Sequence, residues 1–386
     1  MLPLIVLSQF AGTSLWFTGN AILPELQRAL GLNQYAVSSV TAAVMLGFVA
    51  GSLCFSFFSL ADRFSPSKLF LVSSLAGAIC NMAIAWWVKD AAGLIFSRFL
   101  TGFLIAGIYP VGMKIASDWY EKGLGKALGF LLGALVLGTA FPHLLYNRTF
   151  DLPWKTVLAC TSALAAAGGL TMALLVGDGP FHRVSGGFRL TAIGEIFRSK
   201  PWRQAALGYF GHMWELYSFW GFLPLLIGFY AEKNGVTLNT HLLSFLVIAT
   251  GAVGCVAGGY LSVRIGNATV AGTALLISGC CCLLSPWSFS LPPAIFIAFL
   301  LIWGFTVCPD SPQFSTLVAR FAPEHLRGTA LTIYNAIGFL ITSISLFVFD
   351  YLFHKTGFPG PENSFAFLGL GALAGLPFVI RLICKK

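Results

Sequence analysis

Residues 58–68 read FSLADRFSPSK and residues 259–267 read GYLSVRIGN, two segments that share one loop pattern. Arg63 matches Arg264, so an offset of 201 residues relates the two copies. Each copy follows an apolar stretch that is long enough to cross a bilayer as a helix. A loop that recurs after corresponding apolar stretches predicts a chain made of two homologous halves.

Other landmarks recur at nearly the same separation. Pro110 and Pro312 lie 202 residues apart, and the motif GKAL at 125–128 corresponds to GTAL at 328–331 with an offset of 203. Because these landmarks are spread along the chain, the repeat covers whole halves rather than a single loop.

The chain is apolar along most of its length. Of its 386 residues, 57% are hydrophobic and 10% are charged, whereas about a quarter of the residues of soluble domains are charged. We therefore predict an all-α polytopic membrane protein with 12 transmembrane helices in two pseudo-symmetric six-helix bundles, residues 1–176 and 205–386, joined by a cytoplasmic linker at 177–204. The predicted spans are 3–23, 35–59, 69–88, 92–117, 126–146, 154–176, 205–230, 241–263, 269–289, 294–318, 328–350 and 364–383.

The net charge of +9 follows the predicted topology rather than indicating a nucleic-acid partner. With both termini placed in the cytoplasm, the inner loops and tail carry fifteen Lys and Arg residues and the outer loops carry six. Met1 leads almost directly into the first span, so we expect no removable signal peptide. We expect a multi-pass protein of the bacterial inner membrane, a monomer in the lipid bilayer.

The chain resembles the major facilitator superfamily. Both loop copies are similar to that family's motif G-x-L-a-D-R-x-G-r-k, although the second copy has Val263 where the motif has Asp. Arg98 and Gly102 are similar to the family's R-x-x-x-G signature in the fourth span. The resemblance implies two bundles around a central cavity, lined by spans 1, 4, 7 and 10, that opens alternately to each side.

An ionisable pair lies within the apolar run 205–230. His212 and Glu215 are three residues apart, which places them on one face of a helix. A carboxylate at that depth costs several kcal/mol unless it is paired, protonated or facing a wet cavity. Asp310 lies beside two prolines in the tenth predicted span, where a broken helix points to the cavity. We predict proton coupling at Glu215, tuned by His212, with Asp310 as a second candidate.

Two alternatives remain open for these groups. His212 could simply satisfy Glu215 as a static pair, and the three side chains could bind a metal ion, although their spacing is not that of a regular metal site. We expect no resident metal and no cofactor.

Further candidates follow from position and the resemblance. Arg98 could contact substrate, snorkel to the interface or hold neighbouring helices together. In the family, the loop Asp and Arg help to close the cytoplasmic side, although these charges could instead report topology alone. The predicted latch residues are Asp62, Arg63, Asp118 and Arg327. The predicted cavity residues are Arg98, Gln9, Thr13, Trp16, Asn20, Tyr109, Tyr217, Thr306 and Gln313.

These observations predict a secondary transporter that moves a small polar organic solute by proton symport. An uncoupled facilitator, an exporter, including one for a metal or metal chelate, and a non-transporting membrane receptor are the alternatives. An enzyme is not expected, because the chain has no phosphate loop, no regular metal spacing and no loop domain that could hold a nucleophile. The expected partners are a small-molecule substrate and protons.

Overall fold

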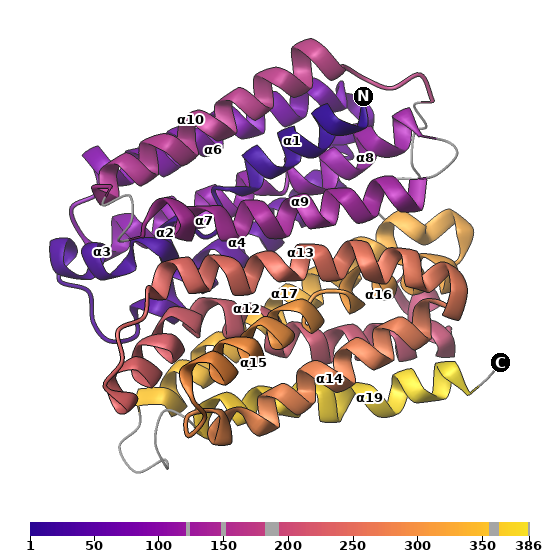
Figure 1. The fold of residues 1–386 in the computed structure, drawn as a ribbon. Helices are drawn as coiled ribbons and strands as arrows, with labels where there is room; N and C mark the ends of the chain where they lie inside the picture. The colour runs from indigo at the N-terminus through magenta and orange to yellow at the C-terminus, as the bar shows by residue number, and fades with distance from the viewer. Residues whose placement is uncertain (121–123, 148–151, 182–192, 355–362, 385–386) are drawn as a thin grey trace. The chain divides into compact units, whose positions relative to one another are not determined.

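The computed structural model describes residues 1–120, 124–147, 152–181, 193–354 and 363–384 (Figure 1). Within these ranges the regular secondary structure is helical. The chain divides into two compact units, Met1–Thr191 and Ala192–Lys386. The boundary falls inside the stretch 177–204 that we expect to be a linker, of which residues 182–192 lie outside the described ranges. The short helix α11 (Ile193–Arg198) lies in the same stretch.

Ten helical segments among the described residues are long and apolar enough to cross a membrane. Two more elements complete the twelve predicted spans: the shorter apolar helix α1 (Leu2–Thr13) and the 35-residue helix α12 (Lys200–Asn234). The ten segments contain α4 (Ala36–Phe57), α6 (Pro66–Trp86), α7 (Ala91–Ile105) with α8 (Tyr109–Trp119), α9 (Leu124–Leu145), α10 (Trp154–Thr171) with η1 (Met172–Val176), α13 (Thr240–Ile265), α14 (Asn267–Ser288), α15 (Pro293–Thr306) with α16 (Asp310–Phe321), η3 (Glu324–Leu326) with α17 (Arg327–His354), and η4 (Phe365–Leu368) with α19 (Gly369–Ile383).

In the first unit, the first span is not one continuous helix. The helix α1 ends at Thr13, and the chain continues through α2 (Thr18–Ala21) and α3 (Leu23–Leu30). The hydroxyl groups of Thr13 and Ser14 donate to the carbonyl oxygens of Gln9 and Ala11, at 2.8 and 2.7 Å. Such bonds compete with the helical ladder and favour a helix end at this point.

In the second unit, α12 runs unbroken. Ser199 accepts a bond from the backbone N–H of Trp202 at its start, and Gly235 ends the helix in the left-handed conformation that glycine adopts at low cost (φ 63°). The tenth span is broken instead, because α15 ends at Thr306 and α16 begins at Asp310. Pro309, which has no backbone donor, precedes α16, as the sequence predicts.

The repeat is visible in how the helices pack. A Cβ atom added to Gly102 of α7 would lie 2.0 Å from the carbonyl oxygen of Val44 in α4. A Cβ atom added to Gly304 of α15 would lie 2.1 Å from the carbonyl oxygen of Val247 in α13. These two pairs differ by 202 and 203 residues, close to the offset of the loop motif. The glycine of the R-x-x-x-G signature therefore permits backbone contact between α7 and α4.

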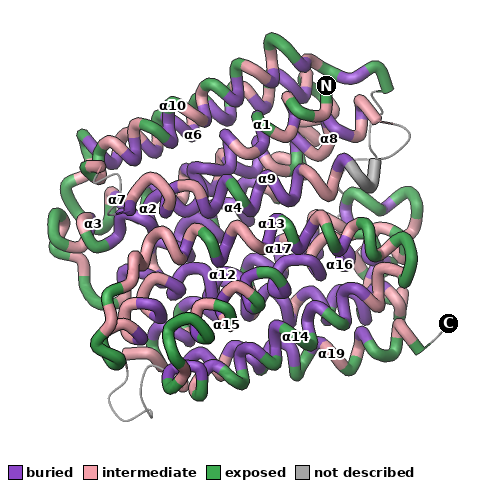
Figure 2. The backbone as a smooth tube through the Cα atoms, in the orientation of Figure 1, coloured by how far each residue is buried: buried purple, intermediate pink, exposed green. Residues whose placement is uncertain are grey.

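Large apolar side chains cover the outer surfaces of both units. Ile79, Phe96, Leu174 and Val263 are among the exposed ones, and exposed positions recur along α10, α14 and α19 (Figure 2). In water such a surface would be unfavourable, whereas lipid accommodates it. The exposed apolar surface is that of an integral membrane protein.

Candidate transport site

His212 and Asp310 form a buried pair in the second unit. His212 Nδ1 of α12 lies 2.9 Å from Asp310 Oδ1 at the start of α16, and their side chains are 1% and 0% exposed. The amino end of α16 also favours a carboxylate, because the helix dipole is positive there. The break in the tenth span thus brings an acidic group to a helix end, beside a histidine.

This pair keeps unused hydrogen-bonding capacity. His212 Nε2 and Asp310 Oδ2 are buried, and neither has a hydrogen-bond partner among the described residues. Asp310 Oδ1 is close to the histidine at ion-pair distance, without an aligned hydrogen bond. Most buried polar atoms in proteins are hydrogen-bonded, so atoms that lack a partner often mark a site with a ligand or a chemical role.

Glu215 has different partners. Its Oε1 accepts a hydrogen bond from Trp303 Nε1 at 2.7 Å, and its Oε2 accepts one from Ser278 Oγ at 3.0 Å. The side chain is fully buried. The indole of Trp303 in turn stacks on Phe219, with ring centroids 4.1 Å apart and an interplanar angle of 16°. Three helices, α12, α14 and α15, therefore converge on one carboxylate.

The static His212–Glu215 pair considered from the sequence is wrong. The two side chains lie on neighbouring turns of α12, but the broken tenth span presents different residues to them. The end of α15 supplies Trp303 to Glu215, and the start of α16 supplies Asp310 to His212. Among the described residues, no group of three His, Cys, Asp or Glu side chains could hold a metal ion.

Two tyrosines that the sequence did not single out lie near the His212–Asp310 pair, and one of them, Tyr209, contacts His212 directly. The ring of Tyr209 stacks on that of Tyr334 at 3.9 Å and on the imidazole of His212 at 5.7 Å. The Tyr209 hydroxyl donates to Asn335 Oδ1 at 3.3 Å. Tyr209 precedes His212 by one helical turn, which is the one sequence signal that could have identified it.

Arg98 lies in the first unit and is fully buried. Its Nη1 donates to the carbonyl oxygen of Leu15 at 3.2 Å, and its Nη2 donates to that of Trp16. Both carbonyls belong to the break after α1, where the helical ladder leaves them without their usual partners. These bonds tie α7 to the broken first span.

Most of the other predicted cavity residues of the first unit also have identified contacts. Trp16 and Tyr109 both lie against Phe48, with ring centroids 5.1 and 6.4 Å apart. Asn20 Nδ2 donates to Thr41 Oγ1 at 2.6 Å.

Gln9 and Thr13 differ in whether their polar side-chain atoms have hydrogen-bond partners. The Thr13 hydroxyl is used within α1, where it donates to the carbonyl oxygen of Gln9. The amide group of Gln9 is fully buried, and neither of its polar atoms has a partner among the described residues.

The remaining predicted residues of the second unit are engaged in local packing. Tyr217 contacts the rings of Trp220 and Phe339, each at 5.4 Å. The Thr306 hydroxyl donates to its own helix at Ile302, and Gln313 Oε1 accepts from Asn267 Nδ2 at 2.7 Å.

The predicted latch residues lie in both units, so the latch itself stays a prediction. Within the first unit, Asp62 Oδ1 of α5 (Leu60–Arg63) lies 2.7 Å from Lys114 Nζ of α8, and Asp118 is buried. Arg63 ends α5. Within the second unit, Arg327 Nη1 lies 3.6 Å from Glu324 Oε1.

The first unit has no ionisable pair at the position that corresponds to His212 and Asp310. Offsets of 200 and 202 lead to Gly12 and Ile108. These two residues pack directly together, because a Cβ atom added to Gly12 would lie 2.6 Å from Ile108 Cγ2. The fold thus forms the same helix contact with an apolar pair, so its geometry alone does not require His212 and Asp310.

Comparison with known proteins agrees with this architecture. A curated gallate transporter of Pseudomonas putida is 22% identical over 356 residues, which cover 82% of this chain and 77% of the transporter. The crystal structure of the human organic anion transporter MFSD10 (TETRAN) aligns with a TM-score of 0.74 at 16% identity, over 98% of both chains, and shows the same fold. The family model described as Major Facilitator Superfamily matches residues 5–346. The chain therefore belongs to the major facilitator superfamily and is a multi-pass membrane transporter rather than an enzyme.

Proposed function

We propose that this protein is a proton-coupled transporter of a small organic anion, and that Asp310 with His212 exchanges the proton. The observation that carries the proposal is the fully buried pair at 2.9 Å, whose outer atoms, His212 Nε2 and Asp310 Oδ2, lack partners among the described residues. Intramembrane ionisable groups commonly mark substrate paths or proton relays.

The chemistry of the pair gives a direct coupling mechanism. A protonated His212 can neutralise either the Asp310 carboxylate or an anionic substrate. Protonation of Asp310 removes its electrostatic attraction for the imidazolium, which can then bind the anion at Nε2. Departure of the anion restores the ion pair once Asp310 releases its proton. Proton and anion therefore favour each other's binding, as thermodynamic linkage requires.

The proposed substrate class follows from the positive charge of a protonated His212, which would attract an anion, and it is supported by two relatives. One is named a gallate transporter and the other an organic anion transporter.

Several further expectations belong to the same proposal. They are symport rather than exchange, alternating access, a bacterial inner membrane, both termini in the cytoplasm and a monomeric protein. Glu215, the first coupling candidate from the sequence, is not part of the proposed exchange, because donors already occupy both of its oxygens.

Reconstituted protein tests the proposal. Proteoliposomes containing a pH-sensitive dye receive an inward gradient of gallate, and proton entry is recorded beside gallate uptake. We expect the wild type to acidify the lumen. Asp310→Asn, which mimics the protonated acid, should exchange gallate for gallate without moving protons.

A matched control is available in the same unit. Asp350 is a buried Asp that also lies beside a histidine, His354, at 2.8 Å. Asp350→Asn should leave proton movement intact. Undiminished proton movement in Asp310→Asn would contradict the assignment of the site. If neither gallate nor any of a panel of aromatic and aliphatic carboxylates is transported, the proposal that the substrate is an organic anion would be contradicted.

A further inference from the structure

We infer that Glu215 controls a hinge in the broken tenth span. Its carboxylate, positioned by Trp303 and Ser278, holds α15 against α12, and protonation of Glu215 releases α15 to move about residues 307–309. This role is separate from the proton exchange proposed for Asp310, and it requires no knowledge of the substrate.

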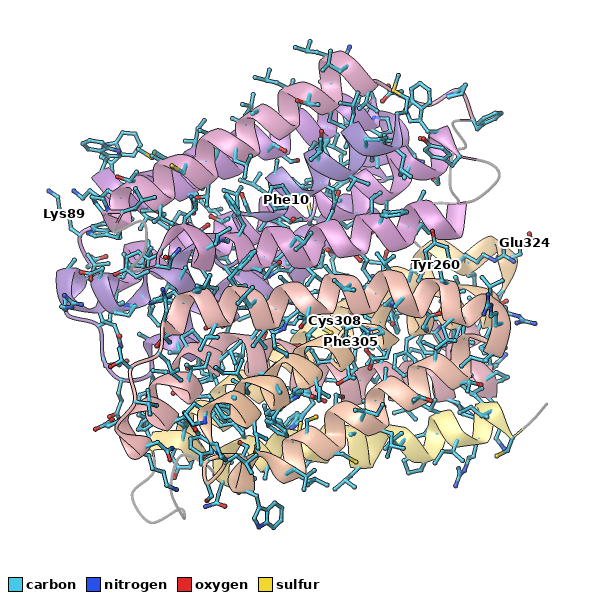
Figure 3. All side chains as sticks on the ribbon, in the orientation of Figure 1. Phe10, Lys89, Tyr260, Phe305, Cys308 and Glu324 are labelled. Atoms are coloured by element: carbon cyan, nitrogen blue, oxygen red, sulfur yellow. The ribbon has the colours of Figure 1, made fainter. Side chains whose placement is uncertain are left out.

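The first element of the hinge is the break itself. Three residues, 307–309, separate α15 from α16, and Figure 3 labels Phe305 and Cys308 in this region. Pro309 lacks a backbone donor and Pro312 lies in the first turn of α16. The helical ladder is therefore interrupted where the two halves of the span meet.

The second element is that α12 holds the span on both sides of this break. Before it, Trp303 of α15 donates to Glu215 at 2.7 Å. After it, Asp310 of α16 lies 2.9 Å from His212. Two neighbouring turns of one continuous helix thus hold two segments whose connection is weak. Loss of either contact would let one segment move while the other stays attached.

The third element is the asymmetry between the halves of the chain. The first unit contains a similar break, between Ile105 and Tyr109. Offsets of 200 and 202 place Leu15 and Thr101 where the second unit has Glu215 and Trp303. Thr101 donates to its own helix, at the carbonyl oxygen of Ser97. A carboxylate contact at such a break is therefore an addition of the second unit and is not required by the fold.

Protonation would weaken this contact for a simple reason. Hydrogen bonds to an ionised acceptor are roughly twice as strong as bonds between neutral groups. Ionised Glu215 offers acceptor oxygens to both Trp303 and Ser278, whereas the neutral acid has one carbonyl oxygen and a hydroxyl group. The charged form therefore favours the held state of α15, and the neutral form favours release.

Other titratable groups face Glu215 and could influence it. The acidic, basic and histidine side chains of α13, α17 and α19 are confined to the end regions of these helices: His241, Arg264, Arg327, Asp350, His354 and Arg381. Cys255 of α13 and Tyr334 of α17 lie further from the helix ends. The groups that act on Glu215 or feel its charge are His212 on its own helix, Asp310 on α16, Cys281 and Cys282 on α14, and Cys308 in the break. Of these, Asp310 is the other carboxyl group, so the test must separate it from Glu215.

The test is a measurement, by electron paramagnetic resonance, of the distance between two spin labels on either side of the break. Spin labels at Ile295 and Thr316, both exposed, report on the two ends of the tenth span. At a helical rise of 1.5 Å per residue they would be about 30 Å apart, which suits the method. Attachment through a ketone-bearing unnatural amino acid leaves the nine native cysteines untouched. No substrate is added.

We expect one distance distribution in the wild type at alkaline pH and a second, broader one at acidic pH. Glu215→Gln should give the acidic distribution at both pH values. Asp310→Asn should retain the pH-dependent change. Three results would each overturn the proposed hinge: no pH-dependent change in the wild type, a Glu215→Gln protein that responds like the wild type, or a response that is lost only in Asp310→Asn. None of these results would bear on coupled transport.

A milder variant covers the case in which Glu215→Gln does not fold. Trp303→Phe keeps a ring to pack on Phe219 but removes the indole donor. It should show the released distribution at higher pH than the wild type does. The control Trp287→Phe, at an exposed position of α14, should behave as the wild type. Identical pH profiles for Trp303→Phe and the control would overturn the inference.

Discussion

Asp310 lies against His212 at the position where the first half of the chain packs Ile108 against Gly12. The same helix contact is therefore made once with ionisable groups and once with apolar ones. Burying an ionisable pair rarely gains stability over an apolar pair of similar volume. The presence of the charged pair in one half alone supports the proposed role in proton exchange.

Replacing His212 and Asp310 by their counterparts in the first unit, Gly and Ile, separates a role in function from a role in folding. The single variants His212→Gly and Asp310→Ile each leave one buried ionisable group without its partner, which should cost about 3–5 kcal/mol of stability. The double variant, which reproduces the apolar contact, should be more stable than either single variant and should not move protons. Thermal unfolding in detergent measures the first expectation, and additive destabilisation would contradict it.

Arg98 should behave as a helix-holding residue. Its two nitrogens donate to carbonyl oxygens of Leu15 and Trp16, so Arg98→Met would leave both carbonyls unpaired. Each bond to a charged donor is worth about 1.5–3 kcal/mol. Arg98→Lys cannot reproduce the paired guanidinium donors and should lose part of this stability. An Arg98→Lys protein with wild-type thermal stability and a raised KM would instead assign Arg98 to substrate binding.

The close packing at Gly102 and Gly304 should make both positions intolerant of alanine. An added Cβ atom would meet the carbonyl oxygens of Val44 and Val247 at 2.0 and 2.1 Å. Forcing the helices apart should cost about 1–3 kcal/mol at either position. Gly129 is the control, because nothing lies within 4 Å of a Cβ atom added there. Equal melting temperatures for the three alanine variants would show that the helices yield easily.

Orientation in the membrane can be tested with reporter fusions. A fluorescent protein at the C-terminus should fold and fluoresce, because the distribution of Lys and Arg predicts that this terminus lies in the cytoplasm. Alkaline phosphatase inserted beside Lys89, between α6 and α7, should be active because that loop is expected outside. The opposite pattern would reverse the topology.

The sequence predicts the repeat, the spans and the break in the tenth span, because these depend on local composition. Apolar length identifies a membrane span, and Pro309 and Pro312 interrupt a helix wherever it packs. The break in the first span was not predicted. Besides the local bonds of Thr13 and Ser14, it involves Arg98, which lies more than eighty residues away in sequence and donates to the carbonyl oxygens of Leu15 and Trp16.

The candidate site was predicted only in part. His212, Glu215 and Asp310 stand out because charge is rare in apolar runs. Their partners could not be assigned, because the spacing of His212 and Glu215 on α12 does not reveal which end of a broken helix reaches each turn. Trp303 and Ser278 look like ordinary residues of apolar helices, and only the folded structure shows that they donate to Glu215.

Proton uptake on substrate binding tests the central claim most directly. Purified protein in weakly buffered detergent solution is mixed with gallate while a pH indicator records the release or uptake of protons. We predict uptake of about one proton per bound gallate in the wild type and in Asp350→Asn, and none in Asp310→Asn. Equal proton uptake by Asp310→Asn and the wild type would contradict the assignment of the exchange site to Asp310 and His212.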